Sequence, residues 1–136
     1  MFKEVADMTQ RTCPGQVRLE VPAGEEYALV AAMTVSGMGV LAGLDVDLIG
    51  DLRTMTCECL DCLRHQPSAA TRVLLEICLR DGRLWVRFEA LQRQRAQQET
   101  GLDLDLTRGV LETLMPDVRL HSDAGGVWGI ECSMPA

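Results

Sequence analysis

The chain has 136 residues, of which 20 are acidic and 13 basic, so its formal net charge is −7. Hydrophobic residues make up 47% of the sequence and aromatic residues 4%, a composition typical of a globular protein with one proper core. The acidic balance argues against partners such as nucleic acid or an anionic membrane surface. Because no stretch approaches the roughly 20 apolar residues of a membrane span and the N-terminus lacks an apolar signal region, we predict a cytoplasmic protein.

The first half of the chain predicts a leader, a strand and two helices. Residues 1–15 are interpreted as an N-terminal leader that ends in the turn Thr12-Cys13-Pro14-Gly15, and residues 16–136 as a single domain. Alternating apolar residues predict a half-buried strand over 16–21. Residues 25–41 follow as a helix whose glycines would allow close packing against another helix. Its expected inward positions are Tyr27, Val30, Met33 or Thr34, Gly37 and Leu41.

The stretch 45–66 predicts an amphipathic helix, capped by Asp45 or Asp47 and stopped by Pro67. Its apolar residues recur at steps of three and four: Ile49, Leu52, Met55, Thr56, Cys59, Leu60 and Leu63. At about 100° per residue, Glu58 and Cys62 fall together on one flank of this apolar stripe. That flank lies between core and solvent, where a pocket can form.

From residue 71 the apolar period changes from 3.6 to 2. Two strands, 71–79 and 84–88, flank Asp81-Gly82, a strong hairpin signal. Residues 91–100 are polar and are interpreted as a mobile loop or a short exposed helix, followed by a helix over 104–115. A second hairpin joins 117–122 to 126–133, with Val118, Leu120, Trp128, Ile130 and Cys132 expected on its buried side. These parts predict an α+β fold: a two-layer sandwich of a largely antiparallel sheet with helices on one face.

The order of these elements resembles the histidine-kinase-like ATPase family, and within it the bacterial anti-sigma factor serine kinases. The resemblance covers roughly 17–134. It rests on five pieces taken together: Leu19-Glu20-Val21-Pro22-Ala23, the helix from Asp51 through Glu58, Asp81-Gly82-Arg83-Leu84-Trp85-Val86, Leu111-Glu112-Thr113-Leu114-Met115-Pro116-Asp117-Val118 and Gly126-Val127-Trp128-Gly129-Ile130.

The resemblance implies where a nucleotide site would lie. Glu58 occupies the position of the catalytic base. Cys62 stands where the family has the Asn that holds Mg²⁺. Glu89 stands where the family has the Asp of an Asp-x-Gly motif, and that Asp recognises the adenine amino group. Gly101 and Asp103 fall in the lid, where the family expects Gly-x-Gly. A thiol is unsuited to Mg²⁺, and a carboxylate at 103 would repel phosphate, so these are predicted to be degenerate nucleotide-pocket positions with Glu58 as a vestigial base.

The resemblance therefore implies an anti-sigma-factor-like regulator that acts by binding proteins. Its implied partners are a sigma factor or an anti-sigma antagonist, together with a second copy of the chain, and it needs no cofactor. The alternative is a working protein serine kinase that uses ATP and Mg²⁺, with Asp61 or Asp103 supplying the missing metal ligand. A third possibility is a metal site formed by Cys59, Cys62 and His65, although the cysteines are better explained as small buried residues and no disulfide framework is expected.

Overall fold

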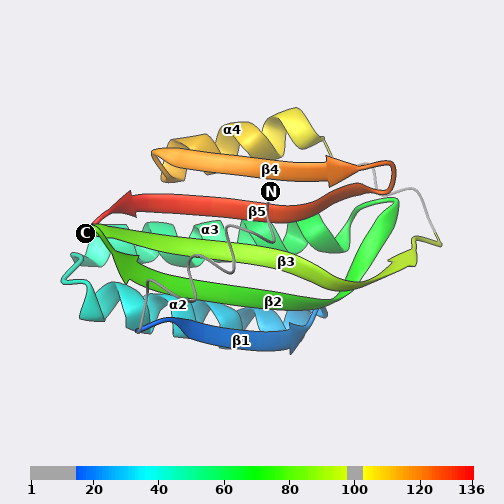
Figure 1. Cartoon of the computed structure of the whole chain (residues 1–136). Coiled ribbons are helices and arrows are strands. Elements are labelled where there is room, and N and C mark those ends of the chain that lie inside the picture. The colour runs from blue at the N-terminus through cyan, green and yellow to red at the C-terminus, as the bar shows by residue number, and fades with distance from the viewer. Residues whose placement is uncertain (1–14, 98–102) are drawn as a thin grey trace.

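A computed structural model describes residues 15–97 and 103–136 of the chain. Five strands form one antiparallel sheet in the order β1-β2-β3-β5-β4, and the helices cover one of its faces (Figure 1). The predicted α+β sandwich is thereby confirmed. The elements are β1 (Val17–Pro22), the 3₁₀ helix η1 (Glu25–Tyr27), α2 (Ala28–Leu41), α3 (Val46–Arg64), β2 (Ser68–Arg80), β3 (Arg83–Arg95), α4 (Leu104–Leu114), β4 (Asp117–Asp123) and β5 (Gly126–Pro135).

Helix α3 lies behind the middle of the sheet, as its sequence pattern predicts. Asp45 caps it, because its side chain accepts a hydrogen bond of 2.9 Å from the backbone N–H of Leu48. The predicted stripe is buried from Leu52 onward, and Ile49 is half-buried. The core beneath it is formed by Val73, Leu75, Ile77, Leu84, Val86, Phe88, Ile130 and Cys132 from the central strands.

Helix α2 turns the opposite face inward from the one predicted. Its buried residues are Ala31, Ala32, Val35, Met38 and Gly39, whereas Tyr27, Val30, Met33 and Leu41 are exposed. The sequence is apolar on every side of this helix, so periodicity could not select a face. The small residues on its inner face let the two helices approach closely, since a Cβ added at Gly39 would lie 2.8 Å from Cδ1 of Leu52. The predicted close packing at a glycine is therefore confirmed at Gly39.

Strand β3 continues through residues that the sequence suggested were a loop or an exposed helix. It runs to Arg95 because β2 begins early, at Ser68, and supplies pairing partners such as Ala69 opposite Gln94 and Ala70 opposite Arg93. The Arg93 guanidinium also donates two hydrogen bonds to Asp123, of 2.7 and 3.0 Å. The loop prediction is wrong over 91–95, and residues 98–100 lie outside the described part.

The hairpin predictions hold with one exception. Asp81 and Gly82 adopt the positive φ angles of 53° and 68° that a tight turn requires. In the second hairpin, Val118 and Leu120 pair with Cys132 and Ile130 as expected. Trp128 is only half-buried and packs against His121 with ring centroids 5.4 Å apart, because the strand register shifts between His121 and Ser122.

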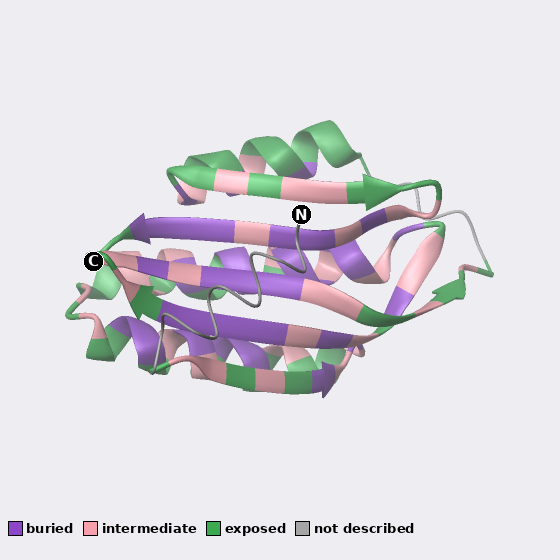
Figure 2. Cartoon of the chain, viewed as in Figure 1, coloured by how far each residue is buried: buried purple, intermediate pink, exposed green. Residues whose placement is uncertain are grey.

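The sheet face opposite the helices carries polar side chains, some of them buried. Figure 2 shows that the central strands are mostly buried and that the edge strands β1 and β4 are more exposed. On this open face, Glu76 and Arg87 form an ion pair although they are only 4% and 6% exposed. Cys78, beside them, is disulfide-bonded, whereas the sequence pattern predicted no disulfide framework. None of the helices in the described ranges has the length and apolar character needed to cross a bilayer.

Candidate functional site

The flank of α3 that faces away from α2 carries the predicted site residues Glu58 and Cys62. Gly39 of α2 sits against Leu52 and Ile49, which identifies the flank of α3 turned toward α2. Glu58 lies about 180° around the helix from Ile49, and Cys62 follows one turn later on the same side. Because α4 contacts α3 from the side opposite α2 (Figure 1), both residues lie along the boundary between α3 and α4.

Cys62 turns its thiol toward the protein interior. It is 1% exposed and belongs to the hydrophobic core. Burial, reinforced by the negative charges of Asp61 and Glu58, raises the pKa of the Cys62 thiol to about 11. The thiol is therefore protonated at neutral pH. A neutral sulfur atom enclosed in the core is a poor ligand for Mg²⁺, which binds oxygen atoms.

Gln66 joins the C-terminal end of α3 to the sheet through two hydrogen bonds, and no sequence motif indicates this role. Its Nε2 donates a hydrogen bond of 2.8 Å to the backbone oxygen of Cys62, and its Oε1 accepts one of 2.9 Å from the N–H of Val127. Gly126 makes room for it, since a Cβ there would lie 2.5 Å from Oε1. Because 61 residues separate Gln66 from Val127, no local pattern could reveal the bridge.

Asp103 is the N-cap of α4. Its Oδ1 accepts hydrogen bonds from the backbone N–H groups of Asp105 and Leu106, at 3.0 and 3.2 Å. Unpaired N–H groups at a helix N-terminus form a ready binding site for an anion such as phosphate. Here a carboxylate of the chain itself already occupies those groups, as N-cap residues commonly do.

Glu89 lies on the other face of the sheet from α3. Side chains alternate along β3, and Phe88 belongs to the core beneath the helices. Glu89 therefore points to the open face, where its charge acts on Arg87. The structure does not bring Glu89 together with the site residues of α3. Gly101, also expected at this site, lies outside the described residues.

The three residues considered as a metal site are engaged separately. In the described part of the chain, no group of three or more His, Cys, Asp or Glu residues is placed to hold a metal ion. Cys59 is buried with its Sγ 3.7 Å from Sδ of Met55, and burial raises the pKa of its thiol well above the ordinary value. The Nδ1 atom of His65 lies 2.8 Å from the backbone oxygen of Asp61. The geometry gives the metal alternative no support.

Comparison with known proteins places the chain among distant relatives of one kind. No protein-family model matches it. Serine-protein kinase RsbW of Listeria monocytogenes serotype 4a is 25% identical in an alignment 132 positions long, which covers 84% of this chain and 84% of the relative. Serine-protein kinase RsbW of Listeria innocua serovar 6a is similar to the same extent. These distant relatives, together with the α+β fold, support the resemblance to anti-sigma factor kinases of the histidine-kinase-like ATPase family.

Proposed function

We propose that this chain is an anti-sigma-factor-like regulatory protein that acts by binding other proteins and has lost the phosphate chemistry of its relatives. The similarity to RsbW proteins supports the regulatory class. In that class the binding partner would be a sigma factor or an anti-sigma antagonist, met in the cytoplasm.

The exposed apolar surface of α2 is the observation that carries the binding role. No charged residue occurs from Tyr27 to Leu44. Five large apolar side chains of α2 are 47–75% exposed: Leu29, Val30, Met33, Val40 and Leu41. Large apolar side chains exposed to this extent on one helix are typical of protein contact sites. A protein with a net charge of −7 repels a second copy of itself, and α2 offers an uncharged surface on which two copies can meet. We therefore propose that α2 forms a homodimer contact.

The positions of three side chains support the loss of nucleotide chemistry. The Cys62 thiol is buried and protonated, the Asp103 carboxylate occupies the amides at the start of α4, and Glu89 points to the opposite face of the sheet. These residues do not fit a Mg²⁺-bound triphosphate, because they present no oxygen ligand at position 62 and a negative charge at position 103.

A binding experiment without nucleotide tests the proposal. The purified chain is used as bait for sigma factors and anti-sigma antagonists of the same organism, with and without Mg²⁺-ATP. We expect a stoichiometric complex that forms equally well in both conditions. A complex that requires Mg²⁺-ATP would contradict the proposal. So would a complex that dissociates when phosphate is transferred to the partner protein.

A second candidate function is an active protein serine kinase. It is favoured by the similarity to proteins named Serine-protein kinase and by the position of Glu58, which lies half-buried at the α3–α4 boundary. Asp61 or Asp103 would have to supply the metal ligand, although Asp61 is paired with Arg64. Transfer of labelled phosphate from ATP to a serine of the partner, abolished in Glu58→Gln, would establish this function.

A further inference from the structure

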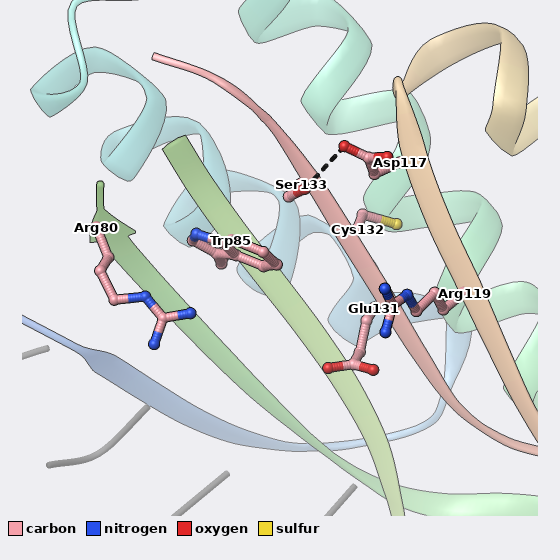
Figure 3. Close-up of a pocket in the computed structure, with 7 residues that line it drawn as sticks. All are labelled: Arg80, Trp85, Asp117, Arg119, Glu131, Cys132 and Ser133. Carbon is pink, nitrogen blue, oxygen red and sulfur yellow. Dashed lines mark hydrogen bonds between the residues drawn. The ribbon is translucent and has the colours of Figure 1, made fainter. Parts of the chain in front are cut away.

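The open face of the sheet holds a pocket that the proposed function does not use. Its volume is about 330 Å³, at the lower end of the range of roughly 300–1,000 Å³ typical of small-molecule sites. Figure 3 shows its walls, which come from four neighbouring strands. They are formed by Arg80 of β2, Trp85 of β3, Asp117 and Arg119 of β4, and Glu131, Cys132 and Ser133 of β5. The sheet separates this pocket from the α3–α4 boundary.

We propose that this pocket binds a small zwitterion with an apolar body, of the chemical class of a free α-amino acid with an aromatic or aliphatic side chain. The walls carry charges of both signs beside an aromatic ring. A simple anion would meet the carboxylates of Asp117 and Glu131, and a simple cation would meet the guanidinium groups of Arg80 and Arg119. A ligand that carries both charges satisfies both kinds of group.

Arg119 supplies the contact for a ligand carboxylate. Its side chain is exposed on β4, and it takes part in none of the ion pairs formed within residues 15–97 and 103–136. A guanidinium group presents a planar fork of N–H donors that matches the two oxygens of a carboxylate. Its neighbour in strand register is Glu131 on β5, so a cationic and an anionic contact lie side by side.

Glu131 and Asp117 supply contacts for a ligand ammonium group. Each has one oxygen engaged: Oε2 of Glu131 lies 2.7 Å from Nε2 of His121, and Oδ2 of Asp117 accepts a hydrogen bond of 2.6 Å from Arg83. A carboxylate has about four acceptor positions. Within the described ranges, no side-chain hydrogen bond reaches the second oxygen of either group, so both retain capacity to bind an ammonium donor.

Trp85 supplies the apolar wall. The guanidinium carbon of Arg80 lies 5.2 Å from the centre of its ring system, which holds the indole in place. The indole Nε1 is buried without a hydrogen-bond partner in the described part of the chain, and such groups usually have one. An apolar ligand side chain against this ring would complete the enclosure. The pocket thus offers, in sequence across the strands, an apolar wall, an anionic contact and a cationic contact.

Three ligands that share a phenyl-bearing body and differ in their charged groups test the proposal on the unaltered full chain. L-phenylalanine carries both charges, 3-phenylpropanoate lacks the ammonium group and phenethylamine lacks the carboxylate. Binding is measured by calorimetry and by the indole N–H signals in NMR spectra, assigned with a Trp128→Phe variant. We expect L-phenylalanine to bind at least about tenfold more tightly than either partial ligand and to shift the Trp85 signal.

Two variants then assign the contacts. Arg119→Gln should weaken L-phenylalanine and 3-phenylpropanoate about tenfold and leave phenethylamine unchanged, whereas Glu131→Gln should weaken L-phenylalanine and phenethylamine and leave 3-phenylpropanoate unchanged. Arg53→Gln, which removes an exposed charge from α3, is the matched control and should change nothing. Because Glu131 also contacts His121, its variant is used only if its circular dichroism spectrum matches that of the unaltered chain.

Three results would overturn the proposal. The first is the absence of heat and of indole shifts with L-phenylalanine up to about 10 mM. The second is equal affinity for the three ligands, which would show that the pocket does not distinguish ligands by their charged groups. The third is an equal loss of affinity in Arg119→Gln and Arg53→Gln, which would show that only the overall charge of the protein matters.

Discussion

At the residue scale, the most informative feature is the buried thiol of Cys62. Its pKa is raised from 9.0 to about 11 by burial and by Asp61 and Glu58. At about pH 8 and below, the thiol is mostly protonated in both the folded and the unfolded chain. As the pH rises from about 9 to about 11, the unfolded chain loses a proton that the folded chain retains, so stability falls.

We therefore predict that the free energy of unfolding decreases between about pH 8 and about pH 10.5 more steeply for the unaltered chain than for Cys62→Ala. Urea unfolding at the two pH values measures the difference. Taking the difference between the two proteins removes the contribution of the shared titrating groups that Cys62 does not influence. Parallel decreases in the two proteins would show that Cys62 is not shielded from solvent as described.

Gln66 carries a second prediction at this scale. Gln66→Leu leaves the buried N–H of Val127 without its acceptor, which should lower the free energy of unfolding by roughly 1–3 kcal/mol. Gln97→Leu, at an exposed position, is the control and should have an effect near zero. If both variants unfold at the same urea concentration as the unaltered chain, the bridge between α3 and β5 does not contribute to stability.

At the element scale, two effects of Asp103 on stability can be separated: the hydrogen bonds by which it caps α4, and its negative charge. Asp103→Ala removes the acceptor for two backbone N–H groups and should lower stability by about 1 kcal/mol, whereas Asp103→Asn retains the cap. Asp105→Ala removes an exposed carboxylate from the same first turn and should cost less. Thermal unfolding of the three variants checks this order, and a larger loss in Asp105→Ala than in Asp103→Ala would reverse the assignment.

The elements also show what sequence patterns could and could not predict. Helix α3 was predictable because its cap and its apolar stripe are local features, and this also placed Glu58 and Cys62 on one flank. The inward face of α2 was not, because the helix is apolar all round and the choice depends on the fit of Gly39 against Leu52. The extension of β3 depends on residues 68–70 of β2, which the local composition of 91–95 does not reveal.

The candidate site was predictable only in part for the same reason. Glu89 was assigned to the nucleotide pocket by its place in the chain, yet alternation along β3 turns it to the open face, beside Arg87. That alternation was visible in the sequence, because Phe88 is the apolar neighbour that must face the core. The role of Gln66 and the pocket around Arg119 arise from contacts between distant strands and helices, which no sequence window contains.

At the scale of the whole molecule, the open face depends on the buried pair of Glu76 and Arg87. Arg87→Met removes the buried partner of the Glu76 carboxylate, which is 4% exposed and keeps its contact with Arg18 at 3.5 Å, and should lower stability by up to about 3–5 kcal/mol. The double variant Glu76→Leu with Arg87→Met removes both charges and should recover most of this loss. Urea unfolding of the single and the double variant measures this recovery of stability. A double variant less stable than the single variant would contradict the account.

The proposed association of two copies also belongs to the scale of the whole molecule. Met33 is 63% exposed on the uncharged surface of α2, so Met33→Glu places a negative charge in the proposed dimer contact. We expect light scattering to give twice the 15.0 kDa mass of one chain for the unaltered protein and a single mass for the variant. Thr54→Glu adds the same charge at an exposed position of α3 and should leave the dimer intact. Dimers in both variants would exclude α2 as the contact.

Titration of the unaltered chain with Mg²⁺-ATP, followed by calorimetry, tests the central claim most directly. Under the proposed function, the buried Cys62 thiol and the Asp103 cap of α4 do not suit a Mg²⁺-bound triphosphate, so the titration should show no saturable heat up to about 1 mM nucleotide. A micromolar Kd for Mg²⁺-ATP, accompanied by phosphate transfer to a bound partner protein, would contradict it.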